Sequence, residues 1–164
     1  MKSNDRRKFI RNIGLAGAAL ATGQNVLASS TEAFRPLSRR TFQPNDAPVR
    51  IGLIGAGGMG VEDATTALQV PGVSITAVCD LYRGRIDDAK KRWGNQIFVT
   101  NDHKELLKRS DVDMVIIATP DHWHMPITVD ALTAGKHVYV EKPMVHNVAE
   151  GMQLVDAWKK SGKL

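Results

Sequence analysis

One cysteine is all that the 164-residue sequence contains, so no disulfide can form within the chain. Cys79 lies inside an apolar run, where a buried thiol packs as a small hydrophobic side chain. The sequence also has little membrane character, because its apolar N-terminal segment, residues 13–21, falls well short of the roughly 20 residues that span a bilayer. Its 43% hydrophobic content suits a globular core. We therefore expect one ordinary globular domain without covalent cross-links.

The region after residue 48 lacks an excess of either charge. Residues 1–48 hold eight Lys or Arg and three Asp or Glu, which accounts for the whole net charge of +5. Residues 49–164 hold fourteen of each kind, so the domain is electrically balanced. A groove that binds phosphate backbones needs its positive charge on the domain itself. The charge distribution therefore argues against a nucleic-acid partner.

The first 28 residues have the organisation of an export signal. Arg6 and Arg7 precede an apolar segment rich in Gly and Ala, and "VLA" at 26–28 offers a small-residue cleavage site after Ala28. With Phe9 in place, the paired arginines resemble a twin-arginine signal, which exports folded proteins to the periplasm. An ordinary secretory leader and an uncleaved anchor are the alternatives. We expect a signal peptide over 1–28, membrane contact only during export, and a flexible linker over 29–48.

Beyond residue 48, short apolar runs alternate with stretches that have helical features. The run at 49–54 is bounded on both sides, as a buried parallel strand should be. Strands that alternate with helices at this spacing predict βαβ units, and hence an α/β fold with a doubly wound parallel sheet of the Rossmann type over 49–164. The expected strands are 49–54, 73–79, 96–100, 112–118 and 137–141. The expected helices end near 69, cover 83–93, begin after 102, cover 126–135 and begin after 147.

Capping residues mark the start of two of these helices. Asp102 with Glu105, and Asn147 with Glu150, have the spacing of capping boxes. The last helix presents an apolar face made of Val148, Met152 and Val155.

The sequence "GAGGMG" at 55–60 follows the first expected strand and opens a helix. Gly55 allows a tight turn, Gly57 lets a pyrophosphate approach the backbone, and Gly60 permits close packing of helix against strand. The N–H groups at the helix start would face the pyrophosphate charge. Asp80, twenty residues beyond Gly60 at the end of the second strand, is placed to accept hydrogen bonds from a ribose. This pattern predicts a dinucleotide site.

The carboxylate at position 80 also bears on the choice of dinucleotide. An acid in this place repels a 2′-phosphate, which favours NAD over NADP. Arg83 and Arg85 lie nearby and weaken that preference without reversing it.

The histidines do not form a metal site by their spacing. His122 and His124 are two residues apart, but no third or fourth ligand follows at a compatible distance. We therefore expect no bound metal. Three further histidines have no companion pattern and are expected at the surface or at strand ends: His103, His137 and His146.

Two further segments extend the pattern to a family. "ATPDHWHMP" at 118–126 and "AGKHVYVEKPM" at 134–144, together with "IGLIGAGGMG" and "VCD", resemble the Gfo/Idh/MocA oxidoreductases. The resemblance implies a first domain that binds NAD(P) and a second α/β domain that supplies the substrate site and the oligomer interface. The sequence stops before that second domain, so we expect only the cofactor half of an active site and no turnover by residues 1–164 alone. The full-length form is expected to be a homo-oligomer.

The resemblance also implies roles for particular residues. Lys142 matches the lysine near the nicotinamide and the substrate hydroxyl, where it would act as the catalytic residue. Glu141 and Pro143 are expected to shape this turn and flank the cofactor. The full set of expected cofactor contacts is Gly55, Ala56, Gly57, Gly58, Met59, Gly60, Asp80, Thr119, Pro120, Trp123, His124, Glu141, Lys142 and Pro143.

Three functions are compatible with this sequence. The first is an NAD(P)-dependent oxidoreductase that acts on a sugar or polyol hydroxyl. The second is an NAD-dependent, redox-neutral glycoside hydrolase of the same superfamily. The third is a nucleotide-binding module without chemistry.

Overall fold

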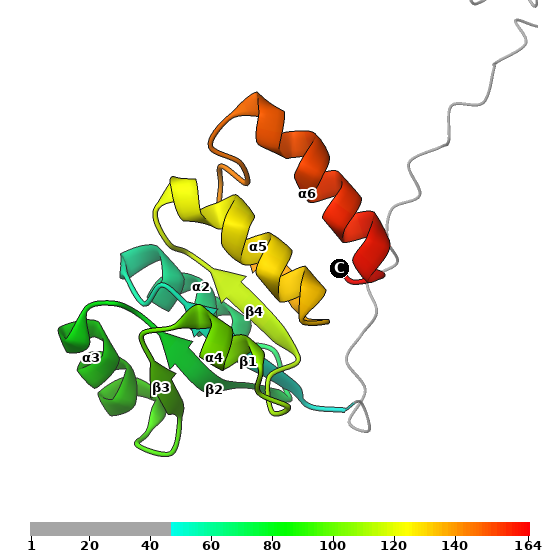
Figure 1. The fold of residues 1–164 in the computed structure, drawn as a ribbon. Coiled ribbons are helices and arrows are strands. Elements are labelled where there is room, and N and C mark those ends of the chain that lie inside the picture. Colours follow the sequence, from blue (N-terminus) through cyan, green and yellow to red (C-terminus); the bar gives the residue numbers. More distant parts are fainter. Residues whose placement is uncertain (1–46) are drawn as a thin grey trace, which may run out of the picture. The chain divides into compact units, whose positions relative to one another are not determined.

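The computed structural model describes residues 47–164, which form a parallel β-sheet with helices on both faces (Figure 1). The predicted signal peptide over 1–28, and the linker over 29–48 except its last two residues, lie outside the described residues. The strands are β1 (Val49–Ile54), β2 (Val73–Cys79), β3 (Phe98–Thr100), β4 (Met114–Ile117) and β5 (His137–Val140). The helices are α2 (Gly58–Ala67), α3 (Arg83–Trp93), α4 (His103–Leu107), the short 3-10 helix η1 (Asp121–Trp123), α5 (His124–Thr133) and α6 (Val148–Ser161). In residues 47–164, no helix is both long enough and apolar enough to cross a membrane.

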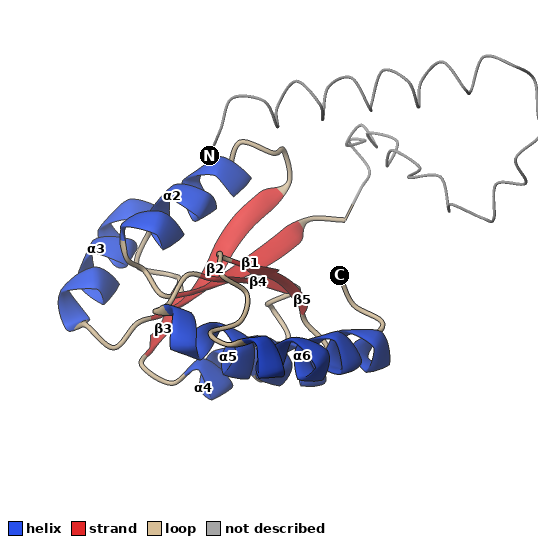
Figure 2. Ribbon diagram, turned by 90° about the horizontal axis from the view of Figure 1, so that it is seen from above, coloured by secondary structure: helices blue, strands red, loops and turns tan. Residues whose placement is uncertain are grey.

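The strand order β3-β2-β1-β4-β5 confirms the doubly wound sheet. All four pairings are parallel, and β1 lies in the centre between β2 and β4. Helices α2 and α3 cover one face of the sheet, and α4, α5 and α6 cover the other (Figure 2). Since the strand order reverses between β1 and β4, the carboxyl ends of these two strands mark the place where open α/β sheets bind ligands.

Alternate residues of the central strand supply the two halves of the core. Ile51 and Leu53 of β1 belong to the apolar cluster that also contains Ala64 of α2. Ile54 belongs to the cluster on the opposite face, with Ile127 of α5. Both faces of β1 are thus buried, and its near-continuous apolar run reflects this position.

One of the two predicted capping boxes forms, and the other is only half correct. At α6, Asn147 and Glu150 make the reciprocal pair that their spacing predicts. At α4, the carboxylate of Asp102 accepts from the backbone N–H of Lys104, as an N-cap should, but Glu105 does not reach back. Its Oε2 instead accepts from the Thr100 hydroxyl at 2.6 Å, because β3 ends beside the helix start.

The predicted apolar face of α6 points away from the sheet. Val148, Met152 and Val155 are all exposed, and Trp158 on the same helix is half exposed. Leu154 is the buried residue of α6, and it faces the domain.

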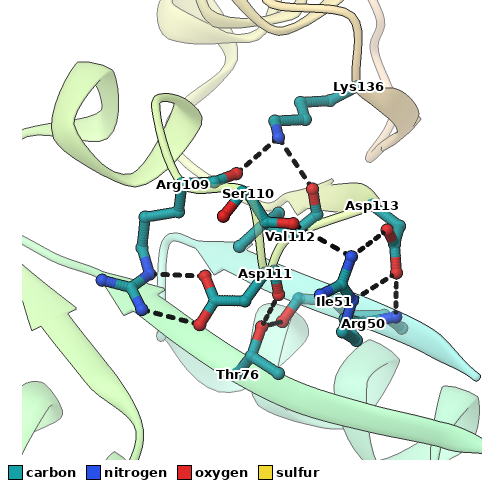
Figure 3. A network of polar contacts seen from close by, with 9 residues as sticks. All are labelled: Arg50, Ile51, Thr76, Arg109, Ser110, Asp111, Val112, Asp113 and Lys136. Carbon is teal, nitrogen blue, oxygen red and sulfur yellow. Dashed lines mark hydrogen bonds and ion pairs between the residues drawn. The ribbon is translucent and has the colours of Figure 1, made fainter.

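A polar network ties the amino ends of the central strands together (Figure 3). The Arg50 guanidinium of β1 donates from Nε and Nη2 to the two carboxylate oxygens of Asp113, at 2.9 and 2.7 Å. Arg109 makes a similar two-point pair with Asp111 and lies over the Phe98 ring, with Cζ 4.3 Å from the ring centroid. Both arginines hold the pKa of their partner carboxyls below the ordinary value.

Thr76 of β2 and Lys136, the residue before β5, complete this network. Lys136 donates from Nζ to the carbonyl oxygens of Arg109 and Val112, at 2.6 and 2.7 Å, and burial lowers the pKa of its ammonium group. Thr76 sits where the register of β1 and β2 shifts by one residue, and its hydroxyl donates to the Asp111 carbonyl at 2.8 Å. The network therefore fixes the strands at the edge opposite to their carboxyl ends.

We expect Asp113→Asn to lower the free energy of unfolding at neutral pH by about 1 kcal/mol, since Arg50 and Asp113 are each 37% exposed and water screens their attraction. Because the pKa of Asp113 is lowered in the folded state, its stabilisation is present above the ordinary value of 3.8 and is lost as the pH falls through the lowered one. Urea unfolding at neutral pH and well below pH 3.8 measures both effects. Asp88→Asn, which removes the exposed pair with Lys91, is the matched control and should change stability at neither pH. If Asp113→Asn lowered the free energy of unfolding equally at both pH values, the stability would not depend on the ionisation of Asp113, and this account of the ion pair would be wrong.

Candidate functional site

The loop between β1 and α2 passes so close to its neighbours that side chains are excluded. Gly55 has φ +92°, and a Cβ there would lie 2.6 Å from the carbonyl oxygen of Ala118. A Cβ on Gly60 would overlap the carbonyl oxygen of Gly55 and press on the Ala118 side chain. Gly55 therefore makes the turn and Gly60 lets α2 approach β1 and β4, as their positions in the motif predict.

The first turn of α2 is open toward the outside of the sheet. Gly57 is the N-cap, no side chain caps the helix, and its first turn has no acidic residue. A Cβ built on Gly58 would meet no atom within 4 Å, so the space above this residue is free. The N–H groups at a helix start lack partners within the helix and attract anions. The loop therefore has the shape and the polarity that a pyrophosphate needs.

Asp80 follows β2 at the same edge of the sheet and is only 7% exposed. Its Oδ2 accepts from the backbone N–H of Ala56 at 2.8 Å, and its Oδ1 accepts from that of Tyr82 at 2.8 Å. Arg85 of α3 lies 3.5 Å away, with its guanidinium above Gly57. The carboxylate therefore holds the glycine-rich loop in place, a role that the spacing alone did not reveal. Because Oδ2 also accepts from Arg85 Nη1, Oδ1 is the oxygen that retains a further lone pair for a hydroxyl donor.

A cleft of about 360 Å³ opens beside Asp80, between the carboxyl ends of β1, β2 and β4. Its volume lies within the range of small-molecule sites. A second hollow, above the start of α2, is lined by Ala56, Gly57 and Gly58 together with Arg85 and Arg92. Of the predicted cofactor contacts, the larger cleft is lined by Gly55, Asp80, Thr119, Pro120 and Trp123.

Other residues of the cleft were not found from the sequence. Asn101, in the loop after β3, and His103, the first residue of α4, line its wall. His103 was expected at the surface or at a strand end. It lies shortly after β3, but its side chain is largely buried and its Nε2 lies 2.9 Å from the Asp130 carboxylate of α5, a contact that was not expected. The two residues are far apart in the sequence, so no local pattern signals their contact. The expectations for the other two hold, since His146 is exposed and His137 lies at the start of β5.

Cys79 is buried at the end of β2, as predicted from its apolar surroundings. Burial, reinforced by the charge of Asp80, raises the pKa of its thiol to about 12. The thiol is therefore protonated at neutral pH and has no nucleophilic role.

Lys142 lies two residues after the end of β5, one strand further along the sheet edge. Its side chain is 86% exposed, and its Nζ lies 4.0 Å from the carboxylate of Glu141. Glu141 is largely buried, and its charge contributes to the raised pKa of Asp63 on α2, for which burial is the main cause. The lysine ammonium is thus exposed, with the Glu141 carboxylate as its neighbour. Met59 is exposed at the start of α2, and it lies outside the walls of the cleft, as do Glu141, Lys142 and Pro143.

His124 lies beneath the loop after β4, at the start of α5, and is only 2% exposed. Both of its ring nitrogens are engaged by the protein, one with the carbonyl of Thr119 and the other with that of Pro143. Its contact with a cofactor stays a prediction, whereas its contact with these two loops is a finding.

The described residues offer no arrangement for a metal ion. Within 47–164, no three His, Cys, Asp or Glu side chains are grouped so that they could hold one. His122 is exposed and pairs with Asp121, and His124 has no free ring nitrogen.

Comparison with known proteins gives one family match and many related structures. Residues 49–164 match the model of the oxidoreductase family GFO_IDH_MocA, described as an NAD-binding Rossmann fold. Among curated proteins, the chain is 33% identical over 177 residues to the alpha-N-acetylgalactosaminidase of Shewanella oneidensis. That alignment covers 99% of this chain and 39% of the relative, so the chain spans about two-fifths of the relative's length.

Two solved structures share the fold and part of the sequence. GenD2 from gentamicin A biosynthesis, solved in complex with NAD, has a TM-score of 0.70 and 29% identity, over 79% of this chain and 36% of its own. The WlbA dehydrogenase from Chromobacterium violaceum, solved with NADH and UDP-GlcNAcA, has a TM-score of 0.67 and 27% identity. The match covers 73% of this chain and 34% of WlbA.

Proposed function

The chain belongs to the Gfo/Idh/MocA family of NAD(P)-dependent oxidoreductases, and on this premise we propose that its site serves hydride transfer to or from a sugar or polyol hydroxyl. One observation carries the proposal: the glycine-rich loop, the open start of α2 and the buried carboxylate of Asp80 meet at one edge of the sheet. Relatives solved with NAD or NADH, one of them also with a nucleotide sugar, support it.

The chain's own residues fit the parts of NAD. The N–H groups at the start of α2 would bind the pyrophosphate, since they lack partners within the helix, the space above Gly58 is open, and the Arg85 guanidinium near Gly57 adds positive charge. The remaining lone pair on Oδ1 of Asp80 would accept from a ribose hydroxyl. NAD supplies the hydride acceptor or donor. The ammonium of Lys142 would orient the substrate hydroxyl and hold its proton, which requires the exposure that the structure gives this side chain.

The surroundings of Asp80 support NAD as the cofactor in preference to NADP. A buried carboxylate repels a 2′-phosphate, and here both of its oxygens are fixed by backbone donors. Arg85 lies at 3.5 Å from that carboxylate and offsets part of this repulsion. We therefore propose that NAD binds more tightly than NADP and that NADP is not fully excluded.

We expect Lys142→Met to lower kcat on the sugar or polyol substrate by about 10²-fold or more, the usual effect of removing a group that handles a proton. The Kd for NAD and the stability should change little, because the side chain is almost fully exposed. The measurement is steady-state NADH formation by the complete gene product, with direct titration of NAD. Lys159→Met on the exposed end of α6 is the matched control and should behave like wild type. A kcat unchanged by Lys142→Met would remove this lysine from the mechanism.

An NAD-dependent glycoside hydrolase is the second candidate. The observation that favours it is the 33% identity, over almost the whole chain, to a relative named alpha-N-acetylgalactosaminidase. Both reactions begin with hydride abstraction from a sugar, but only the hydrolase returns the hydride within the same cycle. Net NADH formation from free sugars supports the oxidoreductase. Release of the aglycone from aryl glycosides without net NADH supports the hydrolase.

We further propose that the protein is exported to the periplasm in its folded state. The paired Arg6 and Arg7 with Phe9 support this, and folding before export would let the chain acquire NAD where that cofactor is abundant. Replacing both arginines with lysine should retain the protein in the cytoplasm, which cell fractionation measures. Unchanged export of that variant would indicate an ordinary secretory leader.

A further inference from the structure

His124 makes two hydrogen bonds that together restrict the protonation of its ring. Nδ1 lies 2.7 Å from the carbonyl oxygen of Pro143, and Nε2 lies 2.7 Å from that of Thr119. A carbonyl oxygen only accepts, and a neutral imidazole carries an N–H on one nitrogen alone. Both bonds therefore exist together only when each ring nitrogen carries a hydrogen.

Within residues 47–164, no carboxylate accepts a hydrogen bond from the His124 ring. Among the described residues, the hydrogen bonds of the His124 ring go to the two carbonyls alone. Bonds from a positively charged donor to a carbonyl are short and strong, which offsets the cost of burying the charge. The titratable side chains on the segments around it are Asp121 and His122 of η1, Asp130 of α5, His103 of α4, Glu141, Lys142 and His146 after β5, and Glu150 of α6.

The two carbonyls belong to the loops that carry the predicted nicotinamide end of the site. Thr119 follows β4 and Pro143 follows β5, and the ladder between these strands ends at the pair Ile117 and Val140. The Glu141 N–H still donates to the Ile117 carbonyl at 2.9 Å, but beyond this bond the two segments are no longer joined as a sheet, and His124 connects them there. Pro143 is also the residue directly after Lys142, so whatever fixes Pro143 limits where the lysine lies.

We propose that His124 is a positioning residue, whose imidazole holds a hydrogen on both nitrogens and thereby fixes the Lys142 turn against the Thr119 loop. This role rests on the proposed function, because it serves that site by placing its lysine. It differs from a direct cofactor contact, since the ring is buried and both of its nitrogens are occupied.

A second, exposed link joins the same two segments and provides a comparison. His146 Nδ1 lies 3.3 Å from the carboxylate of Asp121, and both side chains are about half exposed. Such a pair is screened by water and contributes little. We therefore assign the positioning to the buried histidine.

The direct test is NMR of the ring nitrogens in the full chain with isotopically labelled histidine. The expected result is a hydrogen bound to each nitrogen of His124, with the nitrogen shifts of the doubly protonated ring. A single ring hydrogen, or the shifts of either neutral tautomer, would overturn the inference. Titration of ADP-ribose in the same sample tests the nucleotide site separately. Binding of ADP-ribose together with a neutral ring would refute the role of His124 and leave the proposed function intact.

The second test compares His124→Phe with His146→Ala. Phenylalanine places an aromatic ring in the same space but has no N–H to donate to either carbonyl. The backbone order parameters of Lys142 and Met144 should therefore fall from about 0.85 to below about 0.6. His146→Ala should leave them near the wild-type values. Unchanged order in folded His124→Phe, or an equal loss in His146→Ala, would overturn the role. If the phenylalanine variant does not fold, His124→Asn takes its place, and the wild-type NMR measurement still decides.

Discussion

Gly60→Ala is expected to abolish NAD binding and to lower the free energy of unfolding by about 1–3 kcal/mol, the usual cost of forcing an extra methyl into a packed site. The new Cβ would overlap the carbonyl oxygen of Gly55, and backbone atoms cannot rotate aside as a flexible side chain does. Helix α2 would have to move away from β1, and its first N–H groups would move with it. The same movement of α2 therefore weakens NAD binding and lowers the stability.

Gly151→Ala is the matched control for this substitution. Gly151 lies inside α6, and a Cβ there would meet no atom within 4 Å. Alanine is the better helix former, so this variant should be more stable than wild type by about 1 kcal/mol and should bind NAD unchanged. Chemical unfolding and calorimetric titration of both variants give the result. A Gly60→Ala variant that binds NAD like wild type would contradict the close packing of α2 on β1.

Asp80→Ala is expected to weaken NAD binding by about 100-fold, since each strong hydrogen bond to a charged group contributes about 1.5–3 kcal/mol. The carboxylate acts twice, because it accepts from Ala56 in the glycine-rich loop and is placed to accept from the ribose. Its removal leaves the N–H groups of Ala56 and Tyr82 without their partner, so we also expect a loss of about 1–3 kcal/mol in stability. Titration of NAD and urea unfolding measure the two effects.

Asp87→Ala provides the comparison for Asp80. Asp87 is an exposed carboxylate on α3. Its replacement removes the same charge from the same region without breaking a bond to the loop. We expect near wild-type affinity and stability. If both variants lost affinity equally, the effect would come from general electrostatics and not from the position of Asp80.

The sequence predicted the frame of the domain because its signals are local. The apolar runs of the five strands and the glycines at 55, 57 and 60 each act over a few residues, and the alternation of strands with helices predicts the doubly wound parallel sheet. The last helix also starts as its capping residues predict.

The contacts that shape the site depend on residues far apart in the chain. His103 meets Asp130 across α4 and α5, and His124 reaches Pro143 across nineteen positions. Asp80 was correctly placed at the end of β2, but its bond to Ala56 depends on how β1 and β2 lie side by side. These contacts have no periodic signature, so only the folded arrangement reveals them.

The central claim is that the loop at 55–60 and Asp80 together hold NAD, and calorimetric titration of the full chain tests it most directly. We predict saturable binding of NAD at one site, with weaker binding of NADP and no binding by Gly60→Ala. Absence of heat with both oxidised and reduced nicotinamide adenine dinucleotide, in material shown to be folded, would contradict the account.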